Sequence, residues 1–276
     1  MKSACFEYVR AGSASDATLL LQKSAGMGKV IGGGQSLGPM MNLRLAQPEL
    51  LVDVRTIAAL HTCVIEPDAV VLGAATTHAA IEDGLVRDPA QGMMAYVASG
   101  IAYRAVRNRG TLGGSLAHAD PAADWINLMA ILDAEYLLQG PSSQRTVTSE
   151  NWMLGAFTTA LAEDEVLTAV RIPALLPGTR WSYYKVNRKA GEFADAIAAF
   201  IDDPERGVRR ALIGATDGAP HVITDASPLI NGWDDAFADG ELQAAGLVPD
   251  TYEYQIHAVA LRRAALRLTT KDGKAP

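Results

Sequence analysis

Three consecutive glycines, Gly32, Gly33 and Gly34, constrain this chain more than any other feature. They follow the apolar residues Val30 and Ile31, which indicate the end of a buried strand. Glycines add no side-chain packing and raise the entropic cost of folding, so they are expected where φ is positive or where another group approaches closely. The N–H groups of such a turn can form a concave nest for an anion, most often a phosphate. A plain tight turn explains the same pattern, and both interpretations stay open at this point.

A second stretch of the same kind spans residues 107–116, with the sequence RNRGTLGGSL. Its glycine pair, Gly113 and Gly114, stands beside small hydroxyl residues. One stretch is a weak signal, but two in one chain predict a diphosphate held between two loops, with N–H donors from both. The preceding arginines, Arg107 and Arg109, are favoured as surface residues over direct ligand contacts. Neither stretch has the G-x-G-x-x-G spacing of a Rossmann dinucleotide site.

No hydrolytic or phosphoryl-transfer motif accompanies these loops. The sequence contains no G-x-S-x-G, no H-E-x-x-H, no Walker A pattern and no pair of histidines at ligand spacing. A chain with nucleotide loops but no acid, base or metal set is expected to leave the chemistry to a cofactor. A flavin fits that description.

Several stretches together resemble the FAD-binding medium subunit of the molybdenum hydroxylases, the family of xanthine dehydrogenase and aerobic carbon monoxide dehydrogenase. Besides the two glycine stretches they are residues 117–124 (AHADPAAD), 165–168 (EVLT), 171–173 (RIP) and 184–193 (YKVNRKAGEF). The resemblance implies an α+β fold, with a PCMH-type FAD-binding domain at 1–176 made of two α/β lobes, 1–57 and 58–176. It implies a small C-terminal domain at 177–276 with a three-stranded antiparallel sheet and helices.

The resemblance also implies that this chain holds one FAD. The diphosphate would lie between residues 31–37 and 111–115, with Asp124 bonded to the ribose or adenine and Lys185 near a flavin carbonyl. Asp124 can alternatively be a simple helix N-cap. The implied cofactor-binding residues are Ile31, Gly32, Gly33, Gly34, Gln35, Ser36, Leu37, Ile101, Thr111, Gly113, Gly114, Ser115, Asp124, Leu167, Lys185 and Phe193.

Two positions depart from what the resemblance leads us to expect. Phe193 stands where an aromatic residue often lies near the isoalloxazine, but it has no hydroxyl to offer. Ala102 stands where a glycine is expected between Ile101 and Tyr103. A Gly33→Asp substitution is expected to abolish flavin binding, because the new carboxylate would occupy the phosphate position.

The resemblance implies partner subunits. A large subunit with a molybdopterin cofactor would oxidise the substrate, and a small subunit with two [2Fe–2S] clusters would relay electrons to this chain. An external acceptor would remove them, and the complex would be a dimer of heterotrimers. Two alternatives are a flavin-free assembly module and a self-sufficient flavin oxidase.

Composition agrees with such a subunit. The chain has 276 residues and a net charge of −7, so nucleic acid is not an expected partner. Its two cysteines, Cys5 and Cys63, are too few for an iron–sulfur cluster and are expected to be reduced, mostly buried thiols of a cytoplasmic protein. No signal peptide and no membrane span are predicted.

Periodicity predicts a β-α-β-like first lobe, with strands at 6–9, 29–31 and 50–54 and helices at 15–23, capped by Ser15-Asp16, and 39–46. It predicts an antiparallel sheet for the second lobe, with strands at 63–66, 70–73, 135–138, 145–147 and 166–172, and helices at 77–83 and 91–99. The last hundred residues predict strands at 181–186, 194–201 and 208–213 and helices at 241–245 and 252–268. His78 is expected to be a helix-face or cap residue.

Overall fold

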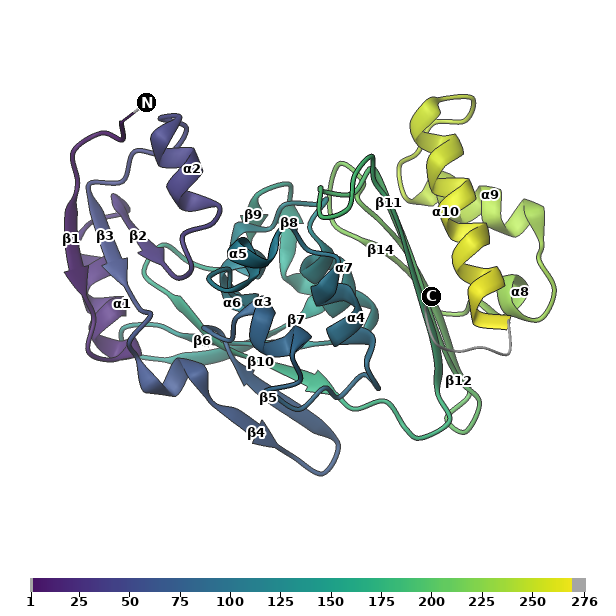
Figure 1. Ribbon diagram of the computed structural model, residues 1–276, viewed down its shortest axis with the longest axis horizontal. Coiled ribbons are helices and arrows are strands. Elements are labelled where there is room, and N and C mark those ends of the chain that lie inside the picture. Colours follow the sequence, from purple (N-terminus) through teal and green to yellow (C-terminus); the bar gives the residue numbers. More distant parts are fainter. Residues whose placement is uncertain (1, 270–276) are drawn as a thin grey trace.

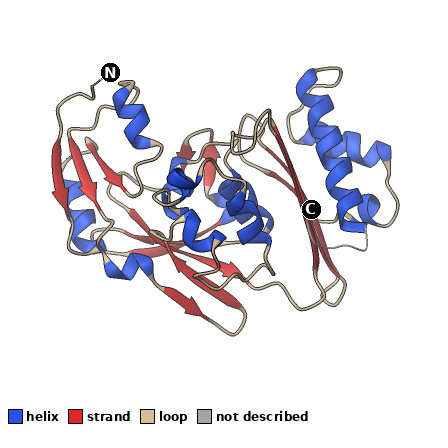
Figure 2. Ribbon diagram, viewed as in Figure 1, coloured by secondary structure: helices blue, strands red, loops and turns tan. Residues whose placement is uncertain are grey.

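Three larger sheets follow one another along the chain and along the long axis of the molecule (Figure 1). The structure is a computed structural model that describes residues 2–269; residues 270–276 of the predicted C-terminal domain lie outside the described part. Helices separate the second sheet from the third and cover the outer face of the third (Figure 2).

The first sheet is parallel and confirms the predicted β-α-β-like lobe. Its strand order is β1 (Glu7–Arg10), β3 (Leu50–Asp53) and β2 (Gly28–Ile31). Helix α1 (Ala14–Lys23) contacts this sheet and also strand β10 of the next one. Its N-cap is Ser13, whose side chain accepts a hydrogen bond from the Asp16 N–H at 3.0 Å, so the expected cap at Ser15 is wrong by two residues. Helix α2 (Leu37–Asn42) has Ser36 as its N-cap and begins three residues after Gly34, so the helix expected at 39–46 starts and ends earlier than predicted.

The second sheet is antiparallel, as predicted. Its order is β4 (Cys63–Ile65), β5 (Ala69–Gly73), β10 (Val166–Pro173), β6 (Glu135–Gln139) and β7 (Gln144–Thr148). The short elements around it are η1 (Ala58–His61), α3 (His78–Glu82), α4 (Met93–Ser99), α5 (Arg104–Arg107), α6 (Leu112–His118), α7 (Asp124–Ile131), η2 (Ser149–Asn151), β8 (Met153–Gly155) and β9 (Thr158–Thr159).

The third sheet has four antiparallel strands, so the expected three-stranded sheet is wrong by one. The strands are β11 (Arg180–Val186), β12 (Ala196–Asp203), β13 (Val208–Gly214) and β14 (His221–Ile223). β14 is three residues long and follows Pro220. Such a short stretch shows too little alternation of polar and apolar residues to be distinguished from a turn in the sequence. Helices α8 (Ser227–Ile230), α9 (Asp235–Ala244) and α10 (Tyr252–Thr269) follow.

Strand β12 explains how this sheet is buried on both faces. Ile197, Ala199 and Ile201 belong to the core that contains the helices of the second lobe. Ala198 and Phe200 point to the other face, into the core closed by α10. Successive side chains of a strand alternate between faces, so a strand covered on both sides is apolar throughout. The first of these cores crosses the predicted boundary at residue 176, and the division into two domains stays a prediction.

Both cysteines are exposed, which corrects the expectation of mostly buried thiols. Cys63 lies in β4, an edge strand whose three residues are all exposed. An edge strand has a neighbour on one side only, and the sequence pattern that predicts a strand does not reveal its place in the sheet.

The contact between β13 and α7 yields a prediction about stability. A Cβ at Gly214 would lie 1.9 Å from the Asn127 Oδ1 atom. The fully buried Asn127 side chain is held there, because its Nδ2 donates to the Pro121 and Ala123 carbonyls, each at 2.9 Å. We expect Gly214→Ala to lower the free energy of unfolding by about 2 kcal/mol through overpacking, measured by urea denaturation. Gly218→Ala is the matched control, since a Cβ there meets nothing within 4 Å; equal midpoints for the two variants would contradict the prediction.

Candidate cofactor site

The two glycine stretches lie side by side. A Cβ at Gly33 would be 1.9 Å from the Arg109 carbonyl oxygen and 2.8 Å from the Gly110 Cα. A Cβ at Gly32 would be 3.1 Å from the Thr111 Oγ1 atom. Gly33 is therefore required because backbone from the second stretch occupies its side-chain position. This corrects the reason given for Gly33→Asp: the substitution would first collide with the protein itself, before any phosphate.

The first stretch offers a row of free backbone donors. Among residues 2–269, the N–H groups from Gly32 to Leu37 donate to no protein acceptor. Gly34 has a φ of +73°, which an L side chain rarely adopts, and the Gln35 side chain donates back to the Gly33 carbonyl at 3.1 Å. Most of these residues are half-buried. Such a row of N–H groups has the chemistry of an anion site.

The second stretch differs from the expected loop. Thr111 is the N-cap of α6, and its Oγ1 accepts the Gly114 N–H at 3.1 Å. The N–H groups of Leu112 and Gly113 donate to the carbonyls of Thr76 and Ala74, each at 2.9 Å. A Cβ at Gly113 would lie 2.5 Å from the Ala74 Cβ, so this glycine allows α6 to approach its neighbour closely. The expected second open nest is wrong for residues 112–115, since their N–H donors already have partners, whereas the Thr111 N–H donates to no acceptor among residues 2–269.

His78 supports the second stretch from behind. Its N–H donates to the Gly110 carbonyl at 3.0 Å, and a Cβ at Gly110 would lie 2.7 Å from its Nε2 atom. Its Nδ1 accepts the Trp125 indole N–H at 2.9 Å. Burial, with a smaller effect of the Arg107 charge, lowers the pKa of His78 from 6.5 to about 4. His78 is therefore neutral, and it is the first residue of α3, in agreement with the expected place on a helix. Among the described residues no group of His, Cys, Asp and Glu is arranged to hold a metal ion.

Asp124 and Lys185 are brought together by the third sheet. The Lys185 ammonium donates to Asp124 Oδ2 and the Tyr183 hydroxyl donates to Asp124 Oδ1, both at 2.8 Å. Asp124 is 5% exposed and is the first residue of α7 rather than its N-cap, which is Ala123. Burial raises the pKa of Asp124, while the ammonium and the phenol oppose that rise. Two residues expected to contact the cofactor separately thus form one buried pair.

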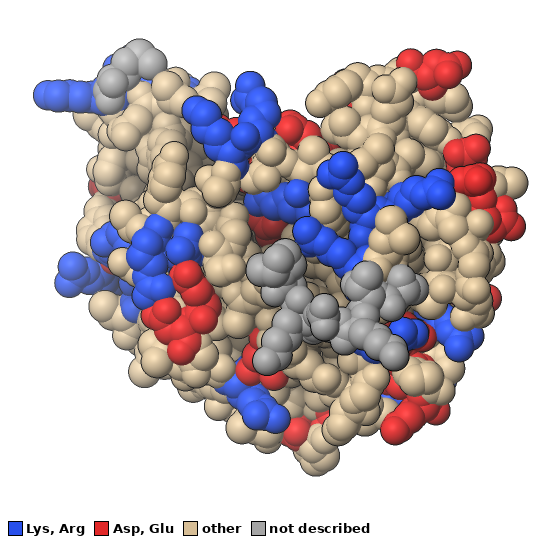
Figure 3. Space-filling view, turned by 45° about the vertical axis from the view of Figure 1, so that its right-hand side comes forward, with Lys and Arg blue, Asp and Glu red and all other residues tan. Residues whose placement is uncertain are grey.

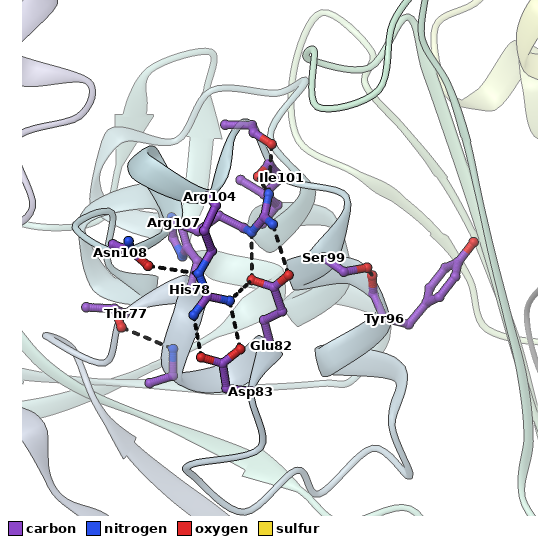
Figure 4. A network of polar contacts seen from close by, with 12 residues as sticks. Thr77, His78, Glu82, Asp83, Tyr96, Ser99, Ile101, Arg104, Arg107 and Asn108 are labelled. Atoms are coloured by element: carbon purple, nitrogen blue, oxygen red, sulfur yellow. Dashed lines mark hydrogen bonds and ion pairs between the residues drawn. The ribbon is translucent and has the colours of Figure 1, made fainter.

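Ile101 and Ala102 lie against the loop that follows β11. The Ala102 N–H donates to the Gly191 carbonyl at 3.0 Å, and Ile101 forms a parallel bridge with Gly191. Ala102 has a φ of +45°, which explains why a glycine is expected there. Arg107 donates to the carbonyls of both Ile101 and Ala102 (Figure 4). Arg107 is thus bonded within the protein and is largely buried, so the expected surface position is wrong for Arg107, while Arg109 is exposed as expected.

An open cleft of about 520 Å³ borders this contact, lined among others by Ala102, Arg107, Lys185 and Gly191. Phe193, two residues after Gly191, is 61% exposed. Leu167 is instead buried in β10, at a register shift of the sheet, and lies in the core. On the face shown in Figure 3, Lys and Arg side chains gather around a hollow at the upper edge, although the whole chain is acidic.

The family can now be assigned. A sequence profile described as the FAD binding domain in molybdopterin dehydrogenase matches residues 4–175. The chain belongs to this family. The predicted resemblance is confirmed: the chain is an FAD-binding flavoprotein subunit of a molybdenum-containing dehydrogenase, an oxidoreductase component, and neither alternative function gains support.

Individual relatives agree with the molybdopterin dehydrogenase family. The carbon monoxide dehydrogenase medium chain of Hydrogenophaga pseudoflava is 40% identical over 223 residues, covering 79% of this chain and 76% of that protein. The nicotine 6-hydroxylase medium subunit of Paenarthrobacter nicotinovorans is 35% identical over 236 residues, covering 84% and 82%. The structure of the Hydrogenophaga pseudoflava carbon monoxide dehydrogenase lacking the Mo-pyranopterin moiety matches with a TM-score of 0.88 and 31% identity, over 97% of this chain and 98% of that one.

A buried carboxylate lies beside the first glycine stretch and is not indicated by any sequence motif. Asp53, at the end of β3, is fully buried and bonded by Arg55 and the Tyr8 hydroxyl. Burial opposes its ionisation, but these hydrogen bonds outweigh that effect and hold the pKa of Asp53 well below its usual value. The sequence signal for this residue is a charged side chain at the end of an apolar strand. In the sheet, Asp53 pairs with Ile31, the residue before Gly32. No helix within residues 2–269 is long and apolar enough to cross a bilayer.

The depressed pKa of His78 predicts an acid-sensitive fold. Between pH 6.5 and about 4 the unfolded chain protonates this histidine and the folded chain does not, so stability falls as pH falls through this window. Over the whole window we expect a contribution of about 3 kcal/mol from this group. Urea denaturation at several pH values, compared with His78→Asn, measures it. Asparagine can still accept the Trp125 hydrogen bond but does not titrate, so identical pH slopes in both proteins would refute the assignment.

Proposed function

We propose that the FAD diphosphate binds to the loop from Gly32 to Leu37. The observation that carries this proposal is the row of consecutive N–H groups without protein acceptors, half-buried and beside Thr111. These donors can be shared among phosphate oxygens without any side-chain charge, as in other backbone anion sites. Ile31 closes the loop from the strand side, since its side chain lies under Gly34.

The second stretch contributes the opposite wall. The Thr111 hydroxyl is close to Gly32 and its O–H proton is free to donate to a ligand, while its oxygen caps α6. Gly113, Gly114 and Ser115 form the first turn of that helix, packed on Ala74. We assign them to the shape of the pocket, with their backbone donors satisfied inside the protein.

The flavin ring is assigned to the cleft beside Ala102 and Gly191. Lys185 lines this cleft, Ile101 directly precedes the lining residue Ala102, and Phe193 follows the lining residue Gly191 by two positions, whereas Leu167 lies in the core. Asp124 has both carboxylate oxygens occupied, so its role is to orient the Lys185 ammonium rather than to bind ribose or adenine. A positive charge fixed in this way favours a ring that carries extra electron density. When bound, FAD supplies the chemistry by accepting and releasing electrons.

The chain works, in this proposal, in a cytoplasmic complex with a large molybdopterin subunit and a small subunit that carries two [2Fe–2S] clusters. Electrons from substrate oxidation leave the complex at this chain and pass to an external acceptor, and the complex is a dimer of heterotrimers. The two relatives are named for carbon monoxide and for nicotine, so similarity in this chain does not select a substrate. Substrate specificity is therefore assigned to another subunit.

Gly33→Ala tests the diphosphate site. The new methyl group collides with the Arg109 carbonyl and forces the two stretches apart, so we expect FAD affinity to fall by about tenfold or more. Fluorescence titration of the flavin-free chain measures this, with near-ultraviolet circular dichroism to show that the variant is folded. Gly38→Ala is the control, because a Cβ there meets nothing within 4 Å. Wild-type affinity in a folded Gly33→Ala protein, or equal losses in both variants, would place the diphosphate elsewhere.

Purification of the native complex tests the assembly. We expect this chain to co-purify with a large and a small subunit, and the preparation to contain flavin, iron and molybdenum together. A chain that purifies alone with FAD and oxidises an organic substrate would instead support the self-sufficient oxidase.

A further inference from the structure

All three guanidinium nitrogens of Arg107 donate hydrogen bonds within the protein. Its Nε and Nη2 atoms donate to the two carboxylate oxygens of Glu82, at 2.7 and 2.9 Å. Its Nη1 atom donates to the carbonyls of Ile101 and Ala102, at 2.9 and 2.8 Å. The side chain is only 11% exposed. Figure 4 shows Arg107 between the Glu82 carboxylate and the backbone near Ile101.

The two carbonyls belong to a strained turn. Ala102 lies in the left-handed region, which disfavours a residue with a Cβ atom. A turn of this kind persists only where its surroundings fix it. The Arg107 hydrogen bonds act on both sides of that residue, because they hold its own carbonyl and the preceding one.

The Ile101–Ala102 turn holds the loop of residues 187–194, which we call the ring loop. Ala102 donates to the Gly191 carbonyl, and a Cβ at Gly191 would lie 2.7 Å from the Ala102 oxygen. Gly191 has a φ of +86°, so it is suited to this close backbone contact. At its other end the ring loop is held by the Ala194 N–H, which donates to Ala122 at 3.3 Å. Phe193 lies between these two attachments.

Arg104 provides a natural comparison on the same helix. It donates to Glu82 and Asp83 through Nη1, at 2.8 and 2.7 Å, and to the Asn108 side chain through Nε. It makes no hydrogen bond to Ile101 or Ala102 within the described residues, and its side chain is 48% exposed. The two arginines therefore share one acidic partner and both line the cleft assigned to the flavin ring, but of the two only Arg107 donates to the carbonyls of the turn.

We propose that Arg107 is a positioning residue of the flavin site: with Glu82 it fixes the Ile101–Ala102 turn, on which the ring loop docks, and so sets the surroundings of the flavin ring. Only a planar fork can bind a carboxylate on one side and two carbonyls on the other, so lysine cannot replace it. Because Ile101, Lys185 and Phe193 are assigned to the ring in the function proposed above, the role of Arg107 in FAD binding depends on that assignment.

The test compares Arg107→Met, Arg107→Lys and the control Arg104→Met in the full chain. In the flavin-free protein, hydrogen exchange of the Ala102 amide reports the turn directly, and we expect exchange about tenfold faster in both Arg107 variants and unchanged in the control. With FAD added, we expect about tenfold weaker affinity in the Arg107 variants and an altered visible circular dichroism band of the bound flavin at saturation. Arg107→Lys keeps the charge, so it serves if Arg107→Met does not fold.

Each outcome decides between the possibilities. Equal exchange, affinity and flavin spectra in Arg107→Lys and Arg104→Met would overturn the role of Arg107. A loss of melting temperature without any change in the bound-flavin spectrum would make Arg107 merely structural, which also overturns it. If the wild-type chain itself fails to bind FAD, the proposed function fails, and the exchange rates still show whether Arg107 holds the turn.

Discussion

The backbone of Arg109 and Gly110 fills the space that a side chain at Gly33 would need, and the whole site depends on this close approach. Because of it, the end of the first sheet and the start of α6 lie together, and in the proposed function they form the two walls of the diphosphate site. Among residues 2–269, the first wall keeps the N–H groups from Gly32 to Leu37 free, whereas in the second wall the N–H groups from Leu112 to Ser115 donate within the protein and that of Thr111 stays free. A ligand with a bridging diphosphate suits such an asymmetric pocket, because one wall can supply most of the N–H groups while the other supplies shape and one hydroxyl.

The sequence was sufficient for the parts of the structure that depend on local pattern. The parallel lobe, the antiparallel second sheet and α10 all follow from apolar periodicity and turn residues. The two glycine stretches were found because multiple adjacent glycines have few local explanations. The reason for glycine at each position was not predictable, because the contacts that a Cβ would make at Gly33 with Arg109 and at Gly113 with Ala74 arise only in the folded chain. For the same reason the pairing of Asp124 with Lys185, the edge position of Cys63 and the three-residue β14 could not be read from periodicity.

Two charged pairs hold the proposed ring side of the site in place, and they do so with different geometry. Lys185 is a point charge directed by one carboxylate, so its ammonium keeps donors for a ligand. Arg107 has a planar guanidinium group whose N–H donors bind Glu82 and backbone carbonyls. It therefore fixes the backbone at Ile101 and does not bind a ligand. Buried ion pairs contribute little net stability, because desolvation offsets much of their attraction. Their role at this place is better explained by the orientation that they impose.

That orientation matters in the proposed function, where the chain passes electrons out of the complex and holds no organic substrate. Medium chains named for carbon monoxide and for nicotine are similar to this chain in sequence, which agrees with a pocket shaped for the cofactor in the proposed function. Such a site needs a rigid backbone around the cofactor. At the turn of Ala102 this rigidity can be measured, because it comes from the Arg107 hydrogen bonds. An alanine in the left-handed region is less favourable than a glycine there by about 1 kcal/mol, and the hydrogen bonds from Arg107 offset that cost. The departure from glycine at this position therefore makes the chain more dependent on its arginine clamp, and the clamp in turn ties the ring loop of the third sheet to α3 and α5 of the second lobe.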